Sequence, residues 1–143
     1  MRVLIDTNVM IDYIVKRSPY LDDAKKLIKL HADDRIDCCV AAHTITNLFY
    51  ILRKDLTKED RVDVLTKFSE MFTVISIDIE KLKSALRNTF FYDFEDCLQD
   101  ECAQAFEADY IVTRNVKDFE SSVVPAIEPK EFLQLIYNED GGV

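Results

Sequence analysis

Two short apolar segments of this chain each run directly into a turn that carries acidic and amide side chains. Val3-Leu4-Ile5 is followed by Asp6-Thr7-Asn8, and Tyr110-Ile111-Val112 is followed by a polar turn over residues 113–119. Short apolar runs bounded by polar turns are typical of buried strands. Because the carboxyl ends of parallel strands lie along one edge of a sheet, where ligands bind in such folds, we expect the two turns to converge and to form a metal site.

Strands alternate with helices along the rest of the chain. The apolar spacing predicts strands at 3–5, 37–40, 74–77, 110–113 and 124–127, and helices from Val9 to before Pro19 and at 21–30, 44–53, 57–71, 79–88, 94–106 and 130–137. This alternation predicts an α/β fold, a three-layer α/β/α arrangement with helices on both faces of a parallel sheet. No linker or internal repeat interrupts it, so residues 1–137 are expected to form a single domain and residues 138–143 a disordered tail.

The composition is that of one globular domain. The chain has 143 residues, 48% of them hydrophobic, and no apolar run approaches the roughly 20 residues needed to cross a bilayer. The first residues contain too short an apolar stretch for the core of a secretory signal. We therefore expect a soluble, cytoplasmic protein that does not associate with membranes.

Several function classes are disfavoured by the residues present. The net charge of −9 produces a field that repels nucleic acid, so a nucleic-acid role has to be local and metal-assisted. Both glycines lie at the extreme C-terminus, which excludes glycine-rich phosphate loops. The four cysteines lack zinc-site spacing and are expected to be buried thiols. His43 could face the crevice from the start of its helix, but neither His31 nor His43 has a nucleophile partner at recognisable spacing, and both are interpreted as surface or cap residues.

The helix expected at 94–106 carries an acidic side. Asp93, Asp96 and Asp100 fall together, opposite an apolar stripe, and like charges at this spacing repel one another. Each acidic segment also has a simpler interpretation: a solvated face for this helix, helix capping for Asp6-Thr7-Asn8, and an Asx-type turn for residues 113–119. Taken together, clustered carboxylates favour a hard divalent cation, magnesium or manganese, that neutralises them.

These segments resemble the PIN-domain family. The resemblance rests on Leu4-Ile5-Asp6-Thr7-Asn8-Val9, the acid-bearing helix at Asp93-Phe94-Glu95-Asp96, and Ile111 to Asn115 through Asp118-Phe119, and it covers nearly the whole chain. It implies a five-stranded parallel sheet and a ribonuclease that uses Mg²⁺ or Mn²⁺ and prefers single-stranded RNA. Many members of the family are VapC-like toxins of toxin–antitoxin pairs and are commonly dimeric, which implies an antitoxin partner and a homodimer.

The resemblance also assigns site residues. By position, Asp6 is the first metal-binding acid, Asp96 the third, and the turn from Asn115 to Asp118 the place of the fourth. Asn47 occupies the place of the usual second acid, a glutamate, and brings no charge. Asp93, Asp118 or Asp100 is then expected to supply the missing negative charge.

The chemistry expected of this set is hydrolysis of a phosphodiester by a metal-bound water. The catalytic set is Asp6, Asp96, Asp118 and Asn47, with Asp93, Asn115 and Asp100 as further metal ligands. Candidate substrate contacts are Asn8, Thr113, Arg114, Lys117, Arg53 and Lys54, although ordinary surface charge is the alternative for each cation. A weakly active or inactive PIN-like domain that binds RNA or a protein remains open, and a phosphatase or receiver-type domain lacks a second acid two residues after Asp6.

The helix at 44–53 contains more apolar surface than one core-facing stripe can bury. Phe49, Tyr50, Ile51 and Leu52 follow one another. Tyr50 and Ile51 are therefore candidates for a dimer interface. The alternative is that the helix at 57–71 covers them within the same chain.

Overall fold

The computed structural model describes residues 1–141 and confirms the predicted α/β class, with five parallel strands in one sheet. The strands are β1 (Arg2–Ile5), β2 (Asp37–Ala41), β3 (Thr73–Ile75), β4 (Tyr110–Val112) and β5 (Ala126–Ile127). Their order is β3-β2-β1-β4-β5, and each neighbouring pair is parallel. The chain thus leaves β1 towards β2 on one side and reaches β4 on the other, so the strand order reverses at β1. A ligand crevice is expected at such a reversal, at the carboxyl ends of the strands.

The helices follow the predicted alternation, with most ends shifted by one or two residues. They are α1 (Thr7–Ile14), α2 (Leu21–Ala32), α3 (Ala42–Ile51), α4 (Lys58–Met71), α5 (Ile79–Arg87), α6 (Phe94–Ala105) and α7 (Pro129–Gly141), with short 3-10 turns η1 (Leu52–Lys54) and η2 (Val116–Phe119). The predicted end of the last helix at Tyr137 was wrong, because no proline or glycine stands between Tyr137 and Gly141 to end it. Residues 142 and 143 of the expected tail lie outside the described residues.

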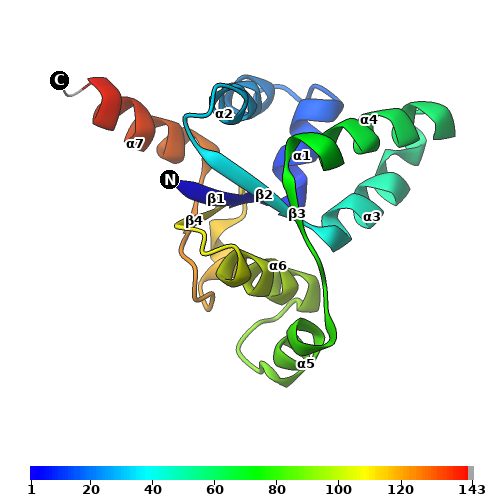
Figure 1. Cartoon of the computed structure of the whole chain (residues 1–143), viewed down its shortest axis with the longest axis vertical. Coiled ribbons are helices and arrows are strands. Elements are labelled where there is room, and N and C mark those ends of the chain that lie inside the picture. The colour runs from blue at the N-terminus through cyan, green and yellow to red at the C-terminus, as the bar shows by residue number, and fades with distance from the viewer. Residues whose placement is uncertain (142–143) are drawn as a thin grey trace.

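The alternation of side chains along β1 divides the core into two layers. Val3 and Ile5 pack with residues of α1, α2, α4 and α7 on one face of the sheet. Leu4 packs with Cys102, Phe106 and other residues of α6 and β4 on the opposite face. Figure 1 shows α1 to α4 and α7 on one side of the sheet and α6, with α5 beyond it, on the other. Helices on both faces explain why the strands are apolar on both sides.

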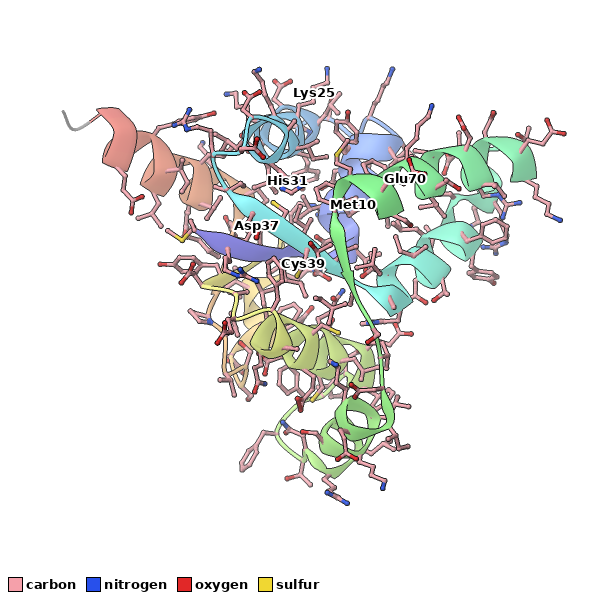
Figure 2. All side chains as sticks on the ribbon, in the orientation of Figure 1. Met10, Lys25, His31, Asp37, Cys39 and Glu70 are labelled. Atoms are coloured by element: carbon pink, nitrogen blue, oxygen red, sulfur yellow. The ribbon has the colours of Figure 1, made fainter. Side chains whose placement is uncertain are left out.

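His31 joins three elements on the first of these faces. Its Nδ1 atom accepts a hydrogen bond from the Cys38 amide at 3.1 Å, so Nε2 carries the proton and donates to the Met71 carbonyl at 2.9 Å. Its ring stacks on Phe72 with centroids 4.8 Å apart. Figure 2 shows His31 beside β2, whereas Lys25 lies on the outer side of α2. His31 is therefore a structural link between α2, β2 and the end of α4 and not the surface residue expected.

Two further expectations concern the cysteines and membrane association. All four cysteines are free and buried, as predicted. Within residues 1–141, no helix is both long enough and apolar enough to cross a membrane.

Candidate functional site

Asp6 lies at the carboxyl end of β1 and begins α1. Its backbone amide donates to the Val112 carbonyl, which sets the end of β1 beside the end of β4. Its side chain caps α1, because Oδ1 accepts from the Thr7 amide at 2.8 Å, and Oδ2 accepts from the Thr113 hydroxyl at 2.8 Å. Burial raises the pKa of Asp6 above its ordinary value, although these hydrogen bonds favour the charged form. Asp6 therefore caps α1 and also lies at the edge of the sheet where a ligand is expected.

Asp96 faces Asp6 across a cavity of about 230 Å³. Asp96 lies in the first turn of α6, which Asp93 caps by accepting from the Asp96 amide at 3.0 Å. Burial, together with the charges of Asp6, Asp93 and Asp118, raises the pKa of Asp96 to about 7. The two carboxyl groups thus form a site that resists ionisation when no cation is bound.

The Gln99 side chain forms hydrogen bonds with three residues at this cavity and beside it. Its Nε2 atom lies 3.1 Å from Asp6 Oδ1, 3.0 Å from Thr44 Oγ1 and 3.3 Å from Thr7 Oγ1. Its carbonyl oxygen Oε1 is buried and has no hydrogen-bond partner, as is the case for Asn8 Oδ1. Gln99 and Asn8 both line the cavity, so two hard oxygen atoms near the carboxylates have no partner within the chain.

Asn47 lines the same cavity and contacts α6. Its side-chain amide donates to Glu95 Oε2 at 3.3 Å. His43, one turn before Asn47, contacts the Glu95 carbonyl at 3.2 Å through Nε2, while its Nδ1 is buried without a partner. Burial lowers the pKa of His43, which favours the neutral ring. His43 therefore lines the cavity, the alternative to a surface or cap position.

The turn after β4 completes the site from the other side. Asn115 lines the cavity with Asp6 and Asp96. Asp118 lies one turn further on, where its amide donates to the Asn115 carbonyl at 3.0 Å, and it lines a neighbouring cavity with Lys117. The charge of Asp118 contributes to the raised pKa values of both Asp6 and Asp96. Asp118 therefore acts on the site through its charge from an adjacent position.

Asp100 is a correction to the sequence-based site. Its two oxygens accept from the amides of Val123 and Val124 at 3.0 Å each, and Oδ2 also accepts from Gln104 at 3.1 Å. One turn after Asp96, at Asp100, α6 packs against the segment that precedes β5. Asp100 is consequently a buried anchor for that segment and not a third acid at the cavity.

Three of the residues predicted to contact a substrate make hydrogen bonds within the chain instead. Arg114 pairs with the buried Asp12 through two hydrogen bonds of 2.6 and 3.2 Å, and its guanidinium stacks over Tyr20 at 4.0 Å. Thr113 is fully buried, and its hydroxyl is used on Asp6 and on the Asn115 amide. Arg53 folds back on Tyr50, bonding its carbonyl and covering its ring at 3.7 Å. The polar groups of Arg114 and Thr113 are therefore used in contacts within the chain. Both residues position other residues of the site and are not placed to contact a substrate.

The remaining cationic candidates differ in position. Lys117 lines the cavity next to the site, whereas Lys54 is exposed in η1. Gln99 and Glu95 line the site cavity and were not chosen from the sequence. The same is true of Thr44, which is buried and hydrogen-bonded to Gln99. Gln99 stands one helical turn after Asp96, which is a usable signal. Nothing local in the sequence marks Thr44, since its place depends on how α3 packs.

The donor set is compatible with a hard divalent cation, but only with amide ligands included. Among residues that the structure describes, no three His, Cys, Asp or Glu side chains are grouped closely enough to hold a metal by themselves. Asp6 and Asp96 supply two carboxylates, and Asn47, Asn115, Asn8 and Gln99 border the same cavity with amide oxygens. Carboxylate and amide oxygens, completed by water, are the ligands that magnesium accepts. The residues present therefore fit such an ion.

Solved structures of low sequence identity share this fold. A chain in the DNA-bound VapBC structure from Salmonella typhimurium superposes with a TM-score of 0.68 and 19% identity, covering 90% of this chain and 98% of that one. A chain in a toxin–antitoxin complex from Klebsiella pneumoniae gives 0.65 and 21%, with 89% and 97% covered. A chain in the promoter-bound VapBC2 structure from Rickettsia felis gives 0.62 and 18%, with 90% and 98% covered. A search of curated protein sequences gives no match.

The fold and the cavity together define a class of protein: a parallel α/β domain with two carboxylates, the buried Asp6 and the half-buried Asp96, at the point where the strand order reverses. The family model described as PIN domain matches residues 2–117, which include every candidate from Asp6 to Lys117. The chain belongs to the PIN domain family.

Proposed function

We propose that this chain is a divalent-metal-dependent endoribonuclease that hydrolyses single-stranded RNA, and that it serves as the toxin of a cytoplasmic toxin–antitoxin pair. The observation that carries this proposal is the pair Asp6 and Asp96, which face one cavity with raised pKa values. Membership of the PIN family and similarity to chains of toxin–antitoxin complexes support it. An antitoxin partner follows from the same similarity.

Asp6 and Asp96 are the residues proposed to hold Mg²⁺ or Mn²⁺, with Asn47 and Asn115 as neutral oxygen ligands. A bound cation of this kind lowers the pKa of a water molecule and stabilises charge on the attacked phosphate. The chain fixes Asp6 through Thr113, Thr7 and Gln99, so that the carboxylate is already oriented when RNA arrives. Arg114 is held by Asp12 and thereby fixes the strand end from which Asn115 extends. These contacts reduce the reorganisation needed for reaction.

A second function is favoured by a specific observation. Asn47 and Asn115 are neutral where charged ligands are expected, and the Gln99 amide already donates to Asp6. A domain of this kind binds its cation weakly and is suited to hold RNA or a protein without cutting it. Incubation of the purified chain with unstructured RNA, with Mn²⁺ and with chelator, separates the two functions, because only the enzyme yields metal-dependent fragments.

Replacing Asn47 with glutamate is expected to tighten Mn²⁺ binding about tenfold, because a charged oxygen replaces a neutral one beside the two carboxylates. Without a cation the same change places a charge next to Glu95 and should lower the melting temperature. Calorimetric titration of Mn²⁺ measures the affinity, and Asn47→Gln provides a neutral control of equal length. If Asn47→Glu binds Mn²⁺ no more tightly than Asn47→Gln, residue 47 lies outside the coordination sphere.

The proposed homodimer uses the exposed edge of α3 and α4. Tyr50 is 64% exposed and Val62 is 49% exposed. Ile51, also expected at the interface, is half-buried and lines the site cavity, so it does not require a partner. Tyr50→Asp is expected to convert a concentration-dependent dimer into a monomer in light scattering. Tyr137→Asp, on α7, is the control, and a wild-type mass that stays monomeric at high concentration contradicts the proposal.

A further inference from the structure

The connection between α5 and α6 presents two aromatic rings to solvent. Phe90 is 83% exposed and Tyr92 is fully exposed, whereas Phe91 between them packs into the core. Exposed aromatic pairs of this kind are uncommon on a surface that has no binding role. In Figure 1 this connection lies at the end of the molecule where α5 packs beside α6.

The connection is held in one conformation by contacts at three places. The Phe90 amide donates to Asn88 Oδ1 at 2.9 Å at its beginning, and Asp93 caps α6 at its end. In the middle, the Phe91 ring meets Phe119 edge to face with centroids 6.4 Å apart. Because Phe91 is anchored inward, its neighbours Phe90 and Tyr92 are directed outward. The backbone that carries the two rings is therefore restrained before binding, which lowers the entropy cost of ordering it.

These rings border a cavity of about 200 Å³ that adjoins the candidate site. Phe90, Phe91 and Tyr92 line one part of it, and Lys117 and Asp118 line another. Two segments run from it to the site cavity: Tyr92 precedes Asp96 by four residues, and Lys117 follows Asn115 by two. Four residues span at most about 14 Å, so Tyr92 and Asp96 are separated by no more than the length of about two or three nucleotides.

We propose that Phe90 and Tyr92 form a stacking platform for unpaired bases of RNA whose backbone enters the neighbouring carboxylate site. The proposal rests on the ribonuclease function proposed above. Aromatic faces accept any base, which suits binding of single strands. Lys117, which lines the same cavity together with Asp118 and Glu120, supplies one positive charge for a phosphate. Stacking also gives an acidic protein of net charge −9 a source of RNA affinity that does not depend on charge.

The test compares RNA with and without bases. A fluorescent, unstructured oligoribonucleotide and an abasic one of equal length are titrated with the full chain in Ca²⁺, and anisotropy is measured with RNA integrity checked by gel. Stacking contributes about 1–3 kcal/mol per base, so Phe90→Ala/Tyr92→Ala, which removes both rings, is expected to weaken binding of the normal RNA by about 30-fold or more. Binding of the abasic RNA should not change, because its phosphates are the same.

Two control variants keep the proposal falsifiable. Phe90→Tyr/Tyr92→Phe retains both ring faces and should bind as the wild type does. Leu86→Ala removes an apolar side chain that is 70% exposed on neighbouring α5 and should have no effect. The platform is refuted if the double alanine variant binds normal RNA as tightly as the wild type, or if it loses normal and abasic RNA equally.

The outcomes also separate this proposal from the function on which it rests. If the wild type cleaves RNA with Mn²⁺ and the double alanine variant keeps full RNA affinity, the ribonuclease stands and the platform does not. If that variant instead loses only an antitoxin protein, the rings serve a protein interface and the platform is equally refuted. If the wild type neither binds nor cleaves RNA, both proposals fail.

Discussion

Asp6→Asn and Asp96→Asn are each expected to reduce metal-dependent cleavage of single-stranded RNA by at least about 100-fold, the upper range for loss of a residue that merely supports a metal ligand. Each change removes one of the two carboxylates that are proposed to hold the cation at the site cavity. Cleavage of a fluorescent oligoribonucleotide, followed over Mn²⁺ concentrations, measures the loss.

Asp63→Asn is a suitable control for these variants. It makes the same acid-to-amide change on the exposed side of α4, where Asp63 pairs with Lys67. It should leave cleavage unaltered. Wild-type rates for Asp6→Asn or Asp96→Asn would show that the cation is held elsewhere.

The difference in stability between the wild type and Asp96→Asn should depend on pH. The folded-state pKa of Asp96 is about 7, above its ordinary value of 3.8, so ionisation of Asp96 destabilises the folded state. This penalty is absent below pH 3.8, grows as the pH rises and is complete above about pH 7. In chelator, Asp96→Asn should therefore melt above the wild type at pH 8, with a smaller difference at pH 5. An equal difference at both values would mean that the carboxylate is not destabilised by its surroundings.

The fold was predictable because its signal is local and repeated. Each buried strand is a short apolar run followed by a polar residue, and capping residues such as Thr57 and Asp78 mark helix starts that the structure also has. Even the departure at the C-terminus has a local cause in the absence of a helix breaker before Gly141. Patterns of spacing therefore account for the layers of this domain.

The site was less predictable, because it depends on which neighbours each polar residue meets. Asp96 and Asp100 look equivalent in sequence, four residues apart on one helix. Asp96 faces Asp6 across a cavity, whereas Asp100 meets the backbone amides of residues 123 and 124, more than twenty positions away. Spacing along a helix identifies a shared side, but it does not identify what packs against each turn.

The same limit applies to the cations. Arg114 follows β4 directly and was a reasonable phosphate contact, yet Asp12 of α1 lies buried beside it and takes both guanidinium hydrogen bonds. Lys117, three residues later, lines a cavity instead. A buried acid at an apolar position of α1 was the signal that could have distinguished them, because such a residue requires a partner.

Asp100→Ala is expected to destabilise the fold by about 2–4 kcal/mol, because it leaves the part-buried amide of Val123 and the buried amide of Val124 without their acceptor. For a domain of this size that corresponds to a fall of roughly 5–15 °C in melting temperature. Asp100→Asn keeps one acceptor oxygen and should lose about half as much. Thermal and urea unfolding measure both variants, with Asp63→Ala as the exposed control.

The decisive comparison is between stability and activity. An anchor of the segment before β5 affects folding and leaves the metal site intact, so Asp100→Asn should retain the Mn²⁺ affinity and cleavage rate of the wild type at temperatures where it is folded. A metal ligand would give the opposite result, with little loss of stability and a large loss of Mn²⁺ affinity. Asp96→Asn provides that opposite pattern within the same helix, since it should be at least as stable as the wild type and inactive. If Asp100→Asn loses Mn²⁺ binding while its unfolding is unchanged, the assignment of Asp100 as a structural anchor is wrong and the acidic side of α6 functions as a unit.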